Sequence, residues 1–179
     1  NEAPSRCIAN LLTGRTTSRT SMTMVSAIRL CKSARTDGPS ECVAAAISKN
    51  GHHKRRHLDP NSKQLLDLCH SSIDAGPANC YRSLPSNVCD DESCVRLCSH
   101  SKGIGPATCA MNFISNLALR NSVTDVSSAL EKLCKNAIDD VPSKCYQKAL
   151  TGDRNSGGKI VKVDPLGAID LCSGAVDTF

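Results

Sequence analysis

The chain has 179 residues and a net charge of +5, and 40% of its residues are hydrophobic but only 2% are aromatic. This hydrophobic share lies below the roughly 45 to 50% common in globular proteins, and few large rings are present to fill a core, so the core must be thin. The longest uninterrupted apolar run, residues 43–47, is far shorter than the roughly 20 residues of a membrane helix, which excludes a membrane span.

The first predicted helix begins at Pro4, in a Pro-x-x-Cys motif that ends at Cys7. Proline fits the first turn of a helix, because its missing N–H would have no partner there and its φ angle is already helical. The same motif recurs at Pro39/Cys42, Pro77/Cys80, Pro106/Cys109 and Pro142/Cys145. We therefore predict that each motif begins a helix, the first helix of a repeating unit.

The second helix of each unit is predicted to end at a Leu-Cys pair, of which Leu30 and Cys31 form the first. The others are Leu68/Cys69, Leu97/Cys98, Leu133/Cys134 and Leu171/Cys172, and a small residue follows each cysteine three positions later. The clearest such helix lies in residues 122–134, where an apolar stripe follows a cap at Ser122 or Thr124. The two motifs interleave at periods of 29 to 38 residues, the range of α-helical repeat arrays.

The segment between a Leu-Cys pair and the next Pro-x-x-Cys motif is predicted to be a corner between two helices. Gly38, Gly76 and Gly105 come directly before the prolines of three corners. Glycine readily takes the left-handed backbone conformation that ends a helix, so we expect Gly-Pro to stop one helix and start the next.

The second unit contains a basic segment between its two predicted helices, within residues 50–62. Six consecutive residues carry basic or imidazole side chains: His52, His53, Lys54, Arg55, Arg56 and His57. They could bind a sulfated or carboxylated glycan, more strongly once the histidines are protonated below about pH 6.5. A solvated charged loop explains them equally well. Nucleic acid is not expected, because no aromatic side chains interleave with the basic ones.

The twelve cysteines are expected to form six disulfides. So many cysteines, in an even number, would be hard to keep as free thiols in an oxidising compartment and would be unusual in a protein of a reducing one. A zinc site would typically use CxxC pairs, and the chain has none. The cations next to the histidines of the basic segment oppose metal binding there. We therefore expect no metal and no cofactor. The cysteines are Cys7, Cys31, Cys42, Cys69, Cys80, Cys89, Cys94, Cys98, Cys109, Cys134, Cys145 and Cys172.

Two pairings of these cysteines fit the repeat. One joins the two cysteines of each corner, which leaves Cys7 and Cys172 at opposite ends of the chain. The other joins the two helices of each unit: Cys7 to Cys31, Cys42 to Cys69, Cys80 to Cys98, Cys109 to Cys134 and Cys145 to Cys172. Cys89 and Cys94 then form an extra bridge in the third unit, where Pro85 shortens both helices. Geometry alone does not choose between the pairings, but the second leaves no cysteine over.

The predicted fold is therefore all-α, a short α-solenoid of five disulfide-clasped helical hairpins. We expect one repeat domain over residues 1–179, with units at approximately 4–34, 39–72, 77–101, 106–137 and 142–175. Catalysis by a cysteine with His70 or His100 is not expected, because the repeat makes the neighbouring cysteines structural. We expect no enzyme activity.

The string Leu-Cys-x-x-Ala-x-x-x-Gly-Pro-x-x-Cys resembles the Cys-rich repeats of predicted secreted proteins in algae and related protists. The likeness extends over nearly the whole chain, apart from the extra cysteines and Pro85 of the third unit. It implies secretion and brings no activity, ligand or catalytic residue.

The function expected from these features is that of a non-enzymatic structural or scaffolding subunit in a secreted or other oxidising extracytoplasmic setting. It would associate with other subunits, or with itself head to tail, through the ends and faces of the repeat stack. The alternative is a binding module that captures acidic glycan with residues 52–57. No charged and apolar leader opens the chain, so we expect Asn1 to begin a mature, soluble protein. The positions of both ends suit excision from a longer array, subunits that meet tail to head, or a lone domain of five units.

Overall fold

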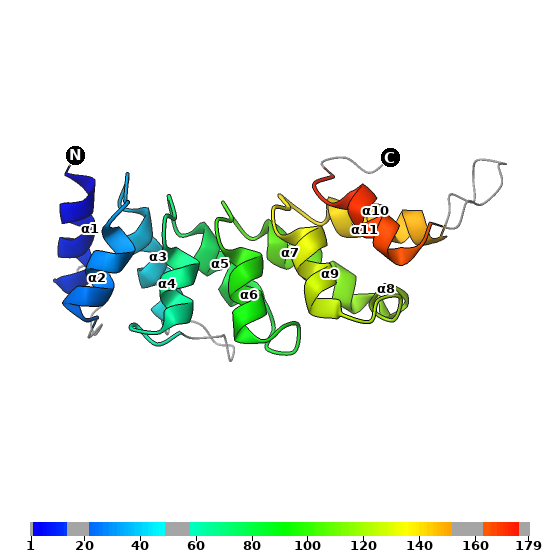
Figure 1. Cartoon of the computed structure of the whole chain (residues 1–179), viewed down its shortest axis with the longest axis horizontal. Coiled ribbons are helices and arrows are strands. Elements are labelled where there is room, and N and C mark those ends of the chain that lie inside the picture. The colour runs from blue at the N-terminus through cyan, green and yellow to red at the C-terminus, as the bar shows by residue number, and fades with distance from the viewer. Residues whose placement is uncertain (1, 14–21, 49–57, 152–162, 176–179) are drawn as a thin grey trace.

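The computed structural model describes residues 2–13, 22–48, 58–151 and 163–175. Within these ranges all regular secondary structure is helical, which confirms the all-α prediction (Figure 1). The helices are α1 (Ala3–Leu12), α2 (Met24–Cys31), α3 (Gly38–Ile47), α4 (Lys63–Cys69), α5 (Gly76–Ser83), α6 (Asp91–Cys98), α7 (Gly105–Ser115), α8 (Leu117–Arg120), α9 (Val126–Cys134), α10 (Val141–Thr151) and α11 (Pro165–Cys172).

The helices form a row of antiparallel hairpins in two layers. The first helices of successive units pack on one another in the order α1, α3, α5, α7 and α10, and the second helices follow in the order α2, α4, α6, α9 and α11. The corners between units lie along one long edge of the row (Figure 1). We call this edge, made of residues 32–37, 70–75, 99–104 and 135–140, the corner edge.

The two kinds of helix begin in different ways. The first helices have proline in their first turn and no side-chain cap, as in α3 and α5. The second helices begin at a capping side chain that accepts a hydrogen bond from a backbone N–H two or three residues later, as Thr23 does for α2 and Asp164 for α11. The cap of α9 was predicted at Ser122 or Thr124, but it is Asp125, whose carboxylate accepts hydrogen bonds from both the N–H and the hydroxyl of Ser128.

The role predicted for the corner glycines is wrong. Gly38, Gly76 and Gly105 lie inside the first turn of their helices, and the left-handed backbone is found two residues after a Leu-Cys pair, at Ser71, His100 and Gly174. The glycines are needed for another reason, since a Cβ atom at any of them would lie within 3.0 Å of the backbone of the next corner. Successive corners therefore stack backbone against glycine.

The last hairpin departs from this regular stacking. Val141 takes the position that glycine holds in the three preceding units. In Figure 1 the axis of α11 is tilted away from those of α4 and α6.

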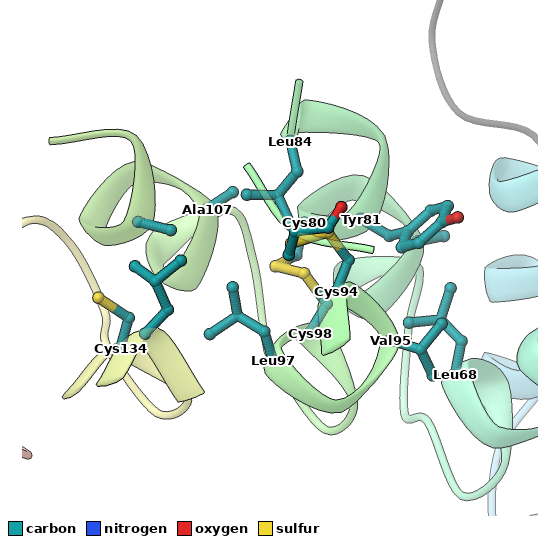
Figure 2. Packing of buried hydrophobic residues seen from close by; sticks show 14 of the residues in the cluster. Leu68, Cys80, Tyr81, Leu84, Cys94, Val95, Leu97, Cys98, Ala107 and Cys134 are labelled. Atoms are coloured by element: carbon teal, nitrogen blue, oxygen red, sulfur yellow. A yellow bond between two sulfur atoms is a disulfide. The ribbon is translucent and has the colours of Figure 1, made fainter. Parts of the chain in front are cut away.

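The core consists of the disulfides and of small and medium apolar side chains between the two layers. Figure 2 shows this packing around Cys80 and Cys98, with Leu97 directed toward Ala107 and Cys134 of the following unit. Larger rings are few, and Phe113 and Tyr146 lie with their ring centroids 5.5 Å apart. Disulfides thus replace the large rings that the composition lacks.

Candidate interaction surfaces

All twelve cysteines form disulfides in the second of the two predicted pairings. The bridges are Cys7–Cys31, Cys42–Cys69, Cys80–Cys98, Cys89–Cys94, Cys109–Cys134 and Cys145–Cys172. Their Cα atoms are 5.5 to 5.8 Å apart, the usual spacing of a disulfide. Every bridge closes within one unit, so each hairpin is clasped and no disulfide joins neighbouring units. No cysteine is free to act as a nucleophile or a metal ligand.

The histidines of the described ranges lie at exposed corners. His70 and Ser71 are adjacent in the corner after α4, and the Ser71 hydroxyl lies 3.0 Å from His70 Nδ1. His100 occupies the corresponding corner after α6, in left-handed backbone. In the part of the chain that the structure describes, no three histidine, cysteine or acidic side chains are grouped so that they could hold a metal ion.

The corner edge carries exposed isoleucines. Ile73 and Ile138 occupy the same repeat position, four residues after the last cysteine of their units, and their exposed fractions are 58% and 83%. Ile104 in the corner between them is 52% exposed. Arg35 and Lys102 hold the same repeat position in the other two corners and are also exposed. Apolar and basic side chains therefore alternate along this edge.

A groove of about 360 Å³ lies between α9 and α11, beside the tilted last hairpin. Its lining is mainly apolar and includes Val123 and Leu166. The charged side chains around it already have partners. Asp125 caps α9, and its hydrogen bond from the Ser128 hydroxyl is the main reason that its pKa is lowered. Lys132 forms an ion pair with Asp170 at 2.5 Å. The charged side chains named here thus already serve a helix cap or an ion pair.

The C-terminal unit exposes a position that is buried in every other unit. The leucine that precedes the last cysteine of a unit is at most 2% exposed in the first four units, at Leu30, Leu68, Leu97 and Leu133. Its counterpart in the fifth unit, Leu171, is 59% exposed. Since Leu97 is directed toward the following unit, this position is normally covered by the next hairpin (Figure 2).

The N-terminal unit shows the complementary pattern. The residue directly after the motif proline is fully buried at Ser40, Ala78, Ala107 and Ser143, but its counterpart Ser5 is exposed. In the second helices, the residue three positions before the last cysteine is 4% exposed at Val95 and 1% at Ile169, but 47% at Ile28. Figure 2 shows Val95 pointing toward Leu68 of the preceding unit. Val95 and Ile169 are thus buried where a preceding hairpin is present, whereas their counterparts Leu66 and Glu131 are partly exposed.

The predicted basic site, His52 to His57, lies outside the described residues. The corner isoleucines and the exposed positions of the end units were not predicted as sites. The sequence could have indicated them through the position that each holds in the repeat. Ile73 and Ile138 lie four residues after the cysteine of a Leu-Cys pair, and Leu171 is the leucine of such a pair.

Across the described ranges, no helix has both the length and the apolar character needed to cross a membrane. No protein-family model, no curated protein and no solved structure matches the chain.

Proposed function

We propose that the protein is a non-enzymatic structural or scaffolding subunit of an extracytoplasmic assembly, and that its hairpin stack is a short α-solenoid. The observation that carries this proposal is the corner edge, where Ile73, Ile104 and Ile138 are exposed in successive corners. Single exposed apolar residues are common on protein surfaces, but a row of them along one edge is typical of a surface that binds another protein.

The disulfides support the same role. Six intramolecular disulfides fit an oxidising environment. A clasp in every unit also limits how far the chain can open when the stack is strained or attacked by proteases, because each unfolded hairpin remains a closed loop. Such resistance to strain and proteases suits a structural subunit of an extracellular assembly.

The experiment measures the size of the protein purified from its natural source under non-reducing conditions. We expect it in a complex much larger than the 19.0 kDa chain, both at low salt and at about 1 M salt, where the Debye length is only about 3 Å. The isoleucine contacts of the corner edge should hold the partner at either salt concentration. A glycan-binding module that uses residues 52–57 would instead elute as a monomer and be released from heparin by salt.

Replacement of a corner isoleucine tests the edge itself. Ile138→Asp should release the protein from the complex, because it places a charge where an apolar contact is expected. Leu166→Asp is the matched control, since Leu166 is 68% exposed but lies at the start of α11, away from the corners. A protein that is monomeric in the native extract at both salt concentrations, or equal behaviour of the two variants, would contradict the proposal.

A further inference from the structure

The two ends of the hairpin row carry complementary apolar positions. On the second-helix layer, Leu171 of α11 holds the position that contacts a following unit, and Ile28 of α2 holds the position that contacts a preceding one. Inside the chain these two positions meet, as Leu68 and Val95 do in Figure 2. An isolated repeat stack normally has polar outer faces on its terminal units. Here each terminal face exposes an apolar residue at a position that takes part in the internal interfaces, Ile28 at one end and Leu171 at the other.

The charges at the two ends also match. Between the first two units, Arg6 Nε lies 2.8 Å from Asp37 Oδ1. Lys144 holds the position of Arg6 in the last unit, and Glu2 holds the position of Asp37 at the start of the first unit. A following copy would therefore place Glu2 near Lys144, as Asp37 lies near Arg6.

A second charged position shows the same complementarity. Lys132 and Asp170 lie two residues before the last cysteines of neighbouring units and form an ion pair. In the first unit this position is Arg29, so a following copy would bring Arg29 toward Asp170. Head-to-tail packing would thus bring opposite charges together at both positions, which favours this arrangement.

We infer that the chain binds a second copy of itself head to tail, with α10 and α11 of one copy against α1 and α2 of the next. This inference rests on the proposed structural role and names the partner at the ends of the row. A contact between different surfaces that does not close into a ring generates an open chain of subunits. The protein would therefore extend its own hairpin row into a filament.

The first measurement is the mass of the oxidised 179-residue chain by light scattering over a range of concentrations. We expect the average mass to rise above 19.0 kDa without reaching a plateau. Leu171→Glu and Ile28→Glu should each weaken association at least about tenfold, because each removes a buried apolar contact and introduces a charge. Leu166→Glu, at a more exposed leucine of the same helix, should leave association unchanged. Helical circular dichroism and the absence of free thiols verify that each variant is folded.

Mixing the two variants distinguishes this contact from a symmetric dimer. Ile28→Glu keeps an intact C-terminal face and Leu171→Glu keeps an intact N-terminal face, so an equal mixture should form dimers and nothing larger. A mixture that stays monomeric, or association that depends on only one of the two residues, would overturn the inference. A parent chain that is monomeric at every concentration would also overturn the inference. The proposed function would still be tested separately, by the size of the complex from the natural source.

A charge exchange provides a second test at exposed residues. Because Lys144 also pairs with Asp140 at 3.0 Å, circular dichroism must show that each variant keeps its helices. Lys144→Glu and Glu2→Lys should each weaken association of the chain with itself. A mixture of the two should restore one kind of contact, between the glutamate of the first variant and the lysine of the second. Failure of the mixture to associate better than either variant alone would count against the proposed pairing.

Discussion

Replacement of Gly105 by alanine should destabilise the protein, whereas the same change two residues earlier should not. A Cβ atom at Gly105 would lie within 3.0 Å of the backbone of Ala137 and Ile138, in the next corner. Backbone atoms cannot turn aside as a flexible side chain can, so the two corners must move apart. At Gly103 an added Cβ would meet no atom within 4 Å.

The size of the difference follows from these surroundings. Overpacking a well-packed site typically costs about 1 to 3 kcal/mol, so Gly105→Ala should lower the free energy of unfolding by about that amount. Gly103 does not have a positive φ angle, so alanine can adopt its backbone conformation. Gly103→Ala should therefore be neutral or stabilise the protein by up to about 1 kcal/mol, because alanine lowers the conformational entropy of the unfolded chain. For a chain of this length each kcal/mol corresponds to a shift in Tm of about 2 to 4 °C.

Urea unfolding followed by circular dichroism, with all disulfides intact, measures both variants. The midpoints should separate in the stated order, with unchanged slopes. If Gly105→Ala unfolds at the same urea concentration as Gly103→Ala, then the corners do not stack as described, and the glycines need another explanation.

Three further predictions concern the clasps, the repeat positions and pH. Replacing both Cys109 and Cys134 by serine should lower the free energy of unfolding by about 3 kcal/mol in urea, because a closed loop is released in the unfolded chain. Leu97→Ala should cost about 2 to 5 kcal/mol, whereas Leu171→Ala in dilute solution should cost less than about 0.5 kcal/mol, since only the first side chain is buried; equal losses would contradict the repeat assignment. Hydrogen bonds from the Ser93 backbone and hydroxyl lower the pKa of Asp90, so its stabilising effect is present above the unfolded value of about 3.9 and is lost as the pH falls through the folded value. Asp90→Ala should therefore cost about 1 kcal/mol at neutral pH, and urea titrations should show this difference shrinking in strong acid.

The sequence predicts the helical hairpins and the disulfide pairing because both depend on local spacing. Proline before cysteine and leucine before cysteine place one sulfur on each helix of a unit. This spacing fits two pairings, and the structure has the one that leaves no cysteine over. The glycine prediction failed because the constraint on Gly38 comes from the backbone of residues 72 and 73, in the next corner. A prediction from neighbouring residues in the sequence does not include that contact.

The interaction surfaces are less visible in the sequence for a related reason. Ile138 lies shortly after a helix, and its apolar side chain is of a type usually found in a protein core. Only the folded structure of the corner shows that it is exposed. Leu171 and Leu133 each precede the last cysteine of a unit, and what separates them is the presence of a following unit. Exposure at these positions is a property of the stack.

The placement of the disulfides has a mechanical consequence. Tension applied between the two termini would cross each hairpin through its sulfur bridge, so the residues between bridged cysteines would bear no load. Only the corners could pull out, and each of the four has the same spacing of eleven residues from one bridged cysteine to the next. Each would lengthen to at most about 36 to 40 Å. The single chain would thus stretch in small, equal increments and stop well short of its full contour length.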